Sequence, residues 1–113
     1  MSITWISQTS TGNRTATAPS EMEDALVATC LASAATGDIN AYYDLGVAYS
    51  TGSHGAACDL IEAHKWFNLA AVAGHEEAAL CRGDIADEMT AREIAEAQRR
   101  ARQWLSAGAR RAA

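Results

Sequence analysis

The chain has 113 residues, of which 49% are hydrophobic and 20% charged, and its formal net charge is −5. This length suits one domain with a modest core, and the acidic balance disfavours a nucleic-acid duplex as partner, because duplex binders present a continuous basic face. No apolar run approaches the roughly 20 residues of a membrane span, so we expect none, and no basic start followed by an apolar stretch indicates a secretion signal.

Charge is distributed unevenly along the chain. Residues 20–90 contain twelve acidic residues against Lys65 and Arg82, a net charge of −10, whereas residues 91–113 contain six arginines against Glu93 and Glu96, a net charge of +4. An acidic body with a basic end permits head-to-tail attraction between chains. The three cysteines have no regular spacing, so we expect a reduced, cytoplasmic protein.

Residues 1–19 are rich in serine and threonine and have no helical apolar period. We therefore expect a flexible N-terminal arm over 1–19. Trp5 and Ile6 are adjacent bulky residues within it. Two interpretations stay open for them: loose contact with the nearest apolar surface, or a short motif or strap that docks into a groove.

A first helix is expected over 20–36. Ser20 and Glu23 have the spacing of a capping box, in which each side chain accepts from the other residue's backbone N–H. Apolar residues then recur at helical spacing up to a stop at Gly37. Cys30 lies on this stripe, where it is expected to act as a small buried hydrophobe. This helix is either the second half of a truncated repeat or an N-terminal cap.

Residues 37–73 predict two amphipathic helices with a loop over 51–58. The first contains Tyr42-x-x-Leu45-Gly46-x-x-Tyr49, and the second contains Ala63-x-x-Trp66. The stretch resembles one unit of the Sel-one-like repeat (SLR) family, which is related to the tetratricopeptide repeats. The matching positions are Gly37, Asp38, Ala41, Leu45, Gly46, Tyr49, Gly52, Asp59, Ala63, Trp66, Ala70, Ala71 and Gly74.

A second, eroded repeat is expected over 74–107. Gly37, Ala41 and Gly46 recur thirty-seven residues later as Gly74, Ala78 and Gly83, and Ala63 and Trp66 recur thirty-eight residues later as Ala101 and Trp104. Leu45 and Tyr49 have become Arg82 and Ala86, which suggests a terminal, partly solvated unit. Thr90 and Glu93 form a second capping box that opens the last helix, and we expect a frayed basic tail over 109–113.

The resemblance implies an all-α fold, a short right-handed α/α solenoid of about five helices within residues 20–108. Alternating small and large residues would let the helices approach closely, and Gly46 would make room for Trp66 or Phe67. The expected core positions are Leu45, Gly46, Tyr49, Ala63, Trp66, Ala70, Gly83, Ala101 and Trp104.

Nothing in the sequence predicts catalysis. It contains no nucleophile elbow, phosphate-binding loop, zinc-protease motif or C-x-x-C pair. His54 and Cys58 could suggest a metal or redox site, but no second pair lies at ligand spacing. His64 is expected on the solvated side of its helix. We therefore expect a non-enzymatic protein with no metal and no cofactor.

The same resemblance implies a scaffold that binds another protein on its concave face. The positions expected there are Asn40, Tyr43, Val47, Ser50, Glu77, Leu80, Asp84 and Asp87. This acidic set favours a peptide or helix of basic and apolar character. The alternative is an accessory subunit of a larger complex or a homo-oligomer, because two repeats alone leave apolar ends. A small-molecule or β-lactam-type binder, as for some secreted relatives, is disfavoured by the missing paired cysteines.

Overall fold

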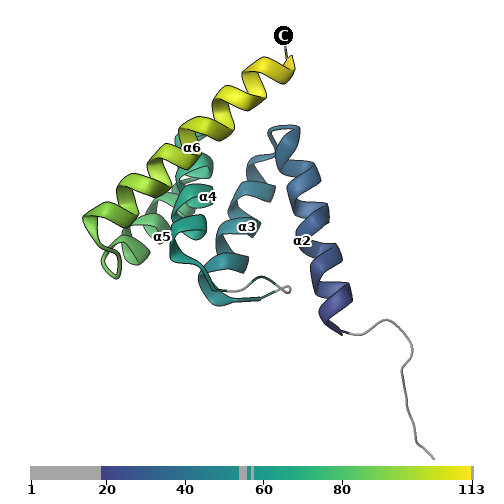
Figure 1. Cartoon of the computed structure of the whole chain (residues 1–113), viewed down its shortest axis with the longest axis horizontal. Coiled ribbons are helices and arrows are strands. Elements are labelled where there is room, and N and C mark those ends of the chain that lie inside the picture. The colour runs from purple at the N-terminus through teal and green to yellow at the C-terminus, as the bar shows by residue number, and fades with distance from the viewer. Residues whose placement is uncertain (1–18, 54–55, 57, 113) are drawn as a thin grey trace, which may run out of the picture.

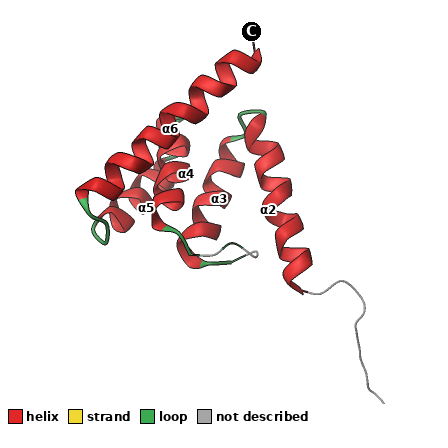
Figure 2. Ribbon diagram, viewed as in Figure 1, coloured by secondary structure: helices red, strands yellow, loops and turns green. Residues whose placement is uncertain are grey.

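The computed structural model describes residues 19–53, 56 and 58–112, and all regular secondary structure in these residues is helical. The helices are α2 (Pro19–Ala35), α3 (Ile39–Thr51), α4 (Leu60–Val72), α5 (Glu76–Ala86) and α6 (Ala91–Ala112), as Figure 2 shows. The all-α prediction is confirmed. The expected arm, apart from Pro19, and His54 lie outside the described residues, and so do the side chains of Ser20 and Glu23.

Local signals fix the ends of the helices. The carboxylates of Asp38 and Asp59 accept hydrogen bonds from the second and third backbone N–H groups that follow each of them, which is the N-cap geometry. Helix α3 is capped at its C-terminal end by Gly52, whose φ of 73° is left-handed and whose N–H donates to Ala48 O. Gly74, at φ 110°, joins α4 to α5, where a side chain would be strained.

Helix α4 is the centre of the packing. It contacts α3, α5 and α6, while α2 covers the other side of α3, an order that can be followed in Figure 1. The largest fully buried side chains are Trp66, Phe67 and Leu45. They share one core cluster with small residues, namely Ala34, Ala41, Ala63, Ala70, Ala78 and Ala101. This alternation of large and small side chains lets the helix backbones approach closely.

Gly46 lies inside helix α3, where glycine is less favourable than alanine and therefore needs a packing reason. A Cβ at this position would lie 2.5 Å from Phe67 Cδ1 and 2.9 Å from its Cγ. Any side chain would therefore displace a ring that is itself only 1% exposed. The sequence predicted that Trp66 or Phe67 needs this room, and the structure shows that it is Phe67.

An aromatic cluster joins α3, α4 and α6. The rings of Tyr42 and Trp66 stack at a centroid distance of 5.9 Å, and Trp104 meets Trp66 edge-on at 4.9 Å. Trp104 Nε1 also donates to Tyr42 Oη at 3.4 Å. Since such pairs add to the free energy of burial, this cluster helps to hold α6 on α4.

Several positions thirty-seven or thirty-eight residues apart have matching environments. Ala41 and Ala78 are both buried, and so are Ala63 and Ala101. Gly83 differs from its counterpart: it is exposed, and a Cβ there would meet nothing within 4 Å. The prediction that Gly83 lies in the core is therefore wrong.

The cause lies in how the last two helices pack. Helix α6 rests on α4, and α5 and α6 have no close packing of the kind that joins α3 to α4. Where α3 has Leu45 and Tyr49, α5 has Arg82 and Ala86, and Arg82 turns back to donate to Asn68 on α4 at 2.7 Å. Helix α5 therefore has no bulky apolar side chain at positions 82 and 86 for α6 to pack against, and Gly83 stays uncovered.

Helix α6 begins as predicted and ends later than predicted. Thr90 N–H donates to Glu93 Oε1 at 2.8 Å, and Glu93 N–H donates to Thr90 Oγ1 at 3.1 Å, so this capping box is confirmed. The helix continues to Ala112, so the expected frayed tail is helical over 109–112. Alanine and arginine are strong helix formers, and they carry the helix past Gly108.

Candidate partner-binding site

Tyr43 is the centre of the predicted binding face. Its ring stacks on His75 at a centroid distance of 4.4 Å and tilts against Phe67 at 5.7 Å. Its hydroxyl donates to Glu77 Oε2 at 3.2 Å. Partial burial, followed by the hydrogen bond to Glu77, raises the pKa of Tyr43, so the phenol remains a neutral donor. These contacts fix the face of α3 against the start of α5.

A cleft of about 480 Å³ lies between α2 and α3 beside this ring. Its lining is mostly apolar, with one carboxylate at the edge: Leu26, Cys30, Tyr43, Asp44 and Val47. Burial, and then the charges of Asp44 and Asp38, raise the pKa of the Cys30 thiol. Cys30 is therefore a poor nucleophile and acts here as part of the wall.

The predicted concave residues fall into two groups. Tyr43, Val47 and Ser50 are half-buried on α3, and the hydroxyl of Ser50 donates to its own helix at Val47 O, 3.0 Å away. The others are exposed: Asn40, Glu77, Leu80, Asp84 and Asp87. The structure brings Tyr43 and Glu77 into contact, with Leu80 one turn beyond Glu77 on α5.

Sequence reasoning missed Leu26, Cys30 and Asp44 as members of this face. The first two were assigned to the apolar stripe of the cap helix, where they were expected to be covered. Leu26 is instead 46% exposed. Asp44 precedes Val47 by three residues, so helical spacing could have placed it on the same side.

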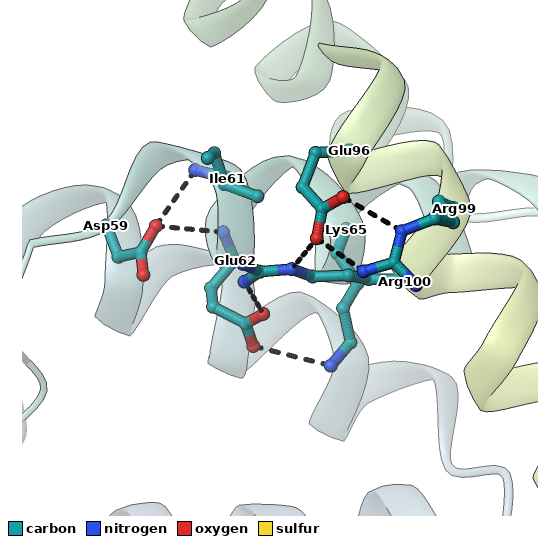
Figure 3. A network of polar contacts seen from close by, with 7 residues as sticks. All are labelled: Asp59, Ile61, Glu62, Lys65, Glu96, Arg99 and Arg100. Carbon is teal, nitrogen blue, oxygen red and sulfur yellow. Dashed lines mark hydrogen bonds and ion pairs between the residues drawn. The ribbon is translucent and has the colours of Figure 1, made fainter. Parts of the chain in front are cut away.

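A second polar cluster joins α4 to α6 (Figure 3). Glu62 accepts from Lys65 at 3.3 Å and from Arg100 at 2.7 Å, and Glu96 accepts from Arg99 at 2.6 Å and from Arg100 at 2.8 Å. Hydrogen bonds from Arg99 and then Arg100 lower the pKa of Glu96 to about 2. Glu96 is thus held ionised by cations, and it is not suited to act as a general acid near neutral pH.

This cluster borders a depression of about 490 Å³ that also reaches Gln103, Trp104 and Ala107. Lys65 Nζ lies 4.2 Å from the ring centroid of Trp66 and 5.6 Å from that of Trp104. The ammonium is therefore engaged by a carboxylate and by aromatic faces. The arrangement is that of a clamp between two helices, because Arg100 links Glu62 of α4 to Glu96 of its own helix.

His64 is not on the solvated side, so the prediction for this residue is wrong. The side chain is 4% exposed, and its Nδ1 has no hydrogen-bond partner in the described part of the chain. Burial, and then the charge of Arg82, lower the pKa of His64 below its ordinary value of 6.5. The sequence placed it on the outer side of α4, but α5 also packs on α4, and the charge of Arg82 on α5 acts on this imidazole.

Among the residues that the structure describes, no metal site, disulfide or membrane-spanning helix is present. No group of three or more His, Cys, Asp or Glu side chains in residues 19–53, 56 and 58–112 is placed to hold a metal ion. Cys30, Cys58 and Cys81 are free thiols. None of the described helices combines the length and the apolar composition of a membrane span.

Comparisons with protein-family models, with curated proteins and with solved structures find no match. The function proposed below therefore depends on the chemistry of the surface around Tyr43 and on the repeat resemblance. We define the Tyr43 face by the residues Leu26, Cys30, Tyr43, Asp44, Val47, Glu77 and Leu80.

Proposed function

We propose that this chain is a non-catalytic, cytoplasmic adaptor that binds a peptide or helix of another protein on the Tyr43 face. The observation that carries the proposal is the mostly apolar cleft between α2 and α3, which Asp44 lines together with Leu26, Cys30, Tyr43 and Val47. Partially exposed apolar patches rimmed by polar residues are typical of protein interaction sites.

The charge of the bordering helices defines the partner. Helices α2 and α3 contain no lysine or arginine, and the single arginine of α5, Arg82, is turned to Asn68 on α4. Asp44 and Glu77 therefore have no neighbouring cation on these three helices. A partner with lysine or arginine beside apolar anchors would complement this face, since opposite potentials speed association and disfavour wrong partners.

The apolar part of the face offers places for such anchors. Leu26 is 46% exposed and Leu80 is 71% exposed, and the half-buried Tyr43 and Val47 line the cleft with Leu26. An amphipathic helix or an extended segment with two or three apolar side chains could bury this area. Tyrosine at the centre of such a patch is the residue type that commonly dominates binding energy.

We also infer that α3 with α4, and α5 with α6, are two SLR-like units of a short right-handed solenoid. The matched burial of Ala41 with Ala78 and of Ala63 with Ala101 supports this inference. The loose packing of α5 on α6 marks the second unit as divergent. An experimentally determined structure in which the two helix pairs do not superpose would remove this part of the proposal.

The test is a titration followed by NMR amide shifts, with a designed amphipathic helix of lysine and leucine as probe. We expect shifts confined to α2, α3 and the start of α5, and no binding by the matched glutamate–leucine helix. Asp44→Lys should weaken binding of the lysine–leucine probe about fivefold, corresponding to a loss of roughly 1 kcal/mol.

The control is Val72→Ser, at a residue that is 73% exposed on α4 and outside the Tyr43 face. It should leave the affinity unchanged. Shifts centred on α6, or equal binding of both probes, would contradict the proposal.

A further inference from the structure

We propose that one partner of the Tyr43 face is the outer surface of helix α6 from a second copy of this chain. The inference rests on the proposed function, because it names an occupant for the same site. It is a head-to-tail contact between two different surfaces: an acidic, apolar face on one copy and a basic, apolar helix on the next.

The basic surface lies on the solvated side of α6. Leu105 is 52% exposed, one of the large apolar side chains that the fold leaves uncovered. Arg102 precedes it by three residues, so the two side chains are neighbours on one helix face. Arg102 is exposed and has no ion-pair partner among the described residues, unlike Arg99 and Arg100.

Helix α6 is longer than the helix on which it rests. The helix has 22 residues and α4 beneath it has 13, which correspond to about 33 Å and 20 Å at 1.5 Å per residue. Figure 1 shows the C-terminal end of α6 projecting away from the other helices. Helix α4 therefore cannot cover α6 along its whole length, and Leu105 and Arg102 are exposed even though the neighbouring Trp104 packs on Trp66.

Charge complementarity selects the second copy as the occupant. Residues 20–90 carry a net charge of −10 and residues 91–113 a net charge of +4. The Tyr43 face requires a basic helix with an apolar anchor, and α6 has Arg102 beside Leu105. A chain cannot satisfy its own site, because Trp104 against Trp66 and Arg100 against Glu62 hold α6 on α4.

The symmetry of the contact makes it testable. Two different patches form a heterologous interface, which extends into open chains or closes into rings. Blocking either patch on every copy should therefore stop assembly. A copy with only the acidic face intact, mixed with a copy with only the basic helix intact, should form a dimer and nothing larger.

The experiment is sedimentation velocity of the full chain over a range of concentrations at 50 mM and 500 mM sodium chloride. We expect the sedimentation coefficient to rise with concentration at low salt and to return towards the monomer value at high salt, because exposed charges are then screened. Leu105→Glu with Arg102→Glu, and separately Asp44→Lys with Leu26→Ser, should each weaken association at least tenfold. Val72→Glu is the control, and it should associate like the unmodified chain.

Mixing the two double variants in equal amounts at low salt should give a one-to-one dimer. A monomer at all concentrations, full association of either double variant alone, or a mixture that remains monomeric would overturn the proposal. Circular dichroism of each variant excludes unfolding as the cause.

Failure here is distinguishable from failure of the proposed function. If the lysine–leucine probe binds the Tyr43 face while the chain stays monomeric, the adaptor proposal stands and this inference falls. If the probe does not bind but assembly depends on Asp44 and Leu105, the Tyr43 face binds only α6 of another copy of this chain. The adaptor proposal then falls and this inference stands.

Discussion

Replacing Gly46 by alanine tests the close approach of α3 to α4. A Cβ at this position would lie 2.5 Å, 2.6 Å and 2.9 Å from the Cδ1, Cε1 and Cγ atoms of Phe67. The ring cannot move away easily, because Phe67 is 1% exposed and its Cγ is fixed close to the backbone. The helices must therefore separate or the ring must leave its preferred rotamer.

The magnitude follows from two opposing terms. Inserting a methyl group into a packed core costs typically about 1–3 kcal/mol. Alanine gains about 1 kcal/mol over glycine in a helix interior. The net change for Gly46→Ala is then a destabilisation of roughly 0–2 kcal/mol. Gly83→Ala is the matched control, because Gly83 also lies inside a helix but has nothing within 4 Å of its Cβ. It should stabilise the protein by about 0.5–1 kcal/mol.

Urea denaturation followed by circular dichroism measures both variants. The informative quantity is the difference between them, about 1–3 kcal/mol in favour of Gly83→Ala. Adding Phe67→Leu to Gly46→Ala should recover part of the loss through a favourable coupling energy. Equal effects of the two glycine substitutions, or no coupling with Phe67, would refute the packing account of Gly46.

The remaining predictions concern pH, capping and the clamp. The folded-state pKa of His64 is lowered from 6.5, so the unfolded chain takes up the proton first. The free energy of unfolding should therefore fall as pH decreases through 6.5. The difference in this free energy between pH 7.5 and pH 5.5, measured by denaturation, should be smaller in His64→Phe than in the unmodified chain. Thr90→Ala should cost about 0.5–2 kcal/mol by loss of the N-cap, whereas Thr90→Ser should not. A double-mutant cycle between Arg100 and Glu62 should give less than about 1 kcal/mol and decrease with salt, because the Arg100 side chain is 35% exposed; a salt-independent coupling would contradict this.

The sequence alone determined the local structure. Capping residues such as Asp38, Asp59 and Thr90, and glycines at the joints, act over three or four residues, so they can be recognised without knowing the fold. The repeat resemblance identified Leu45, Ala63, Trp66 and Ala101 as core residues, and all four are buried because one face of each amphipathic helix must leave water.

Tertiary structure decided which surfaces are covered and by what. Periodicity does not say how many neighbours a helix has, and α4 is surrounded by three, which buries His64 as well as Trp66. It also cannot say that α6 rests on α4 and leaves Gly83 exposed on α5. The cleft beside Tyr43 depends on where α2 lies against α3, a contact between residues distant along the chain. Such contacts depend on how whole helix surfaces fit one another, and this fit cannot be predicted from a short sequence pattern.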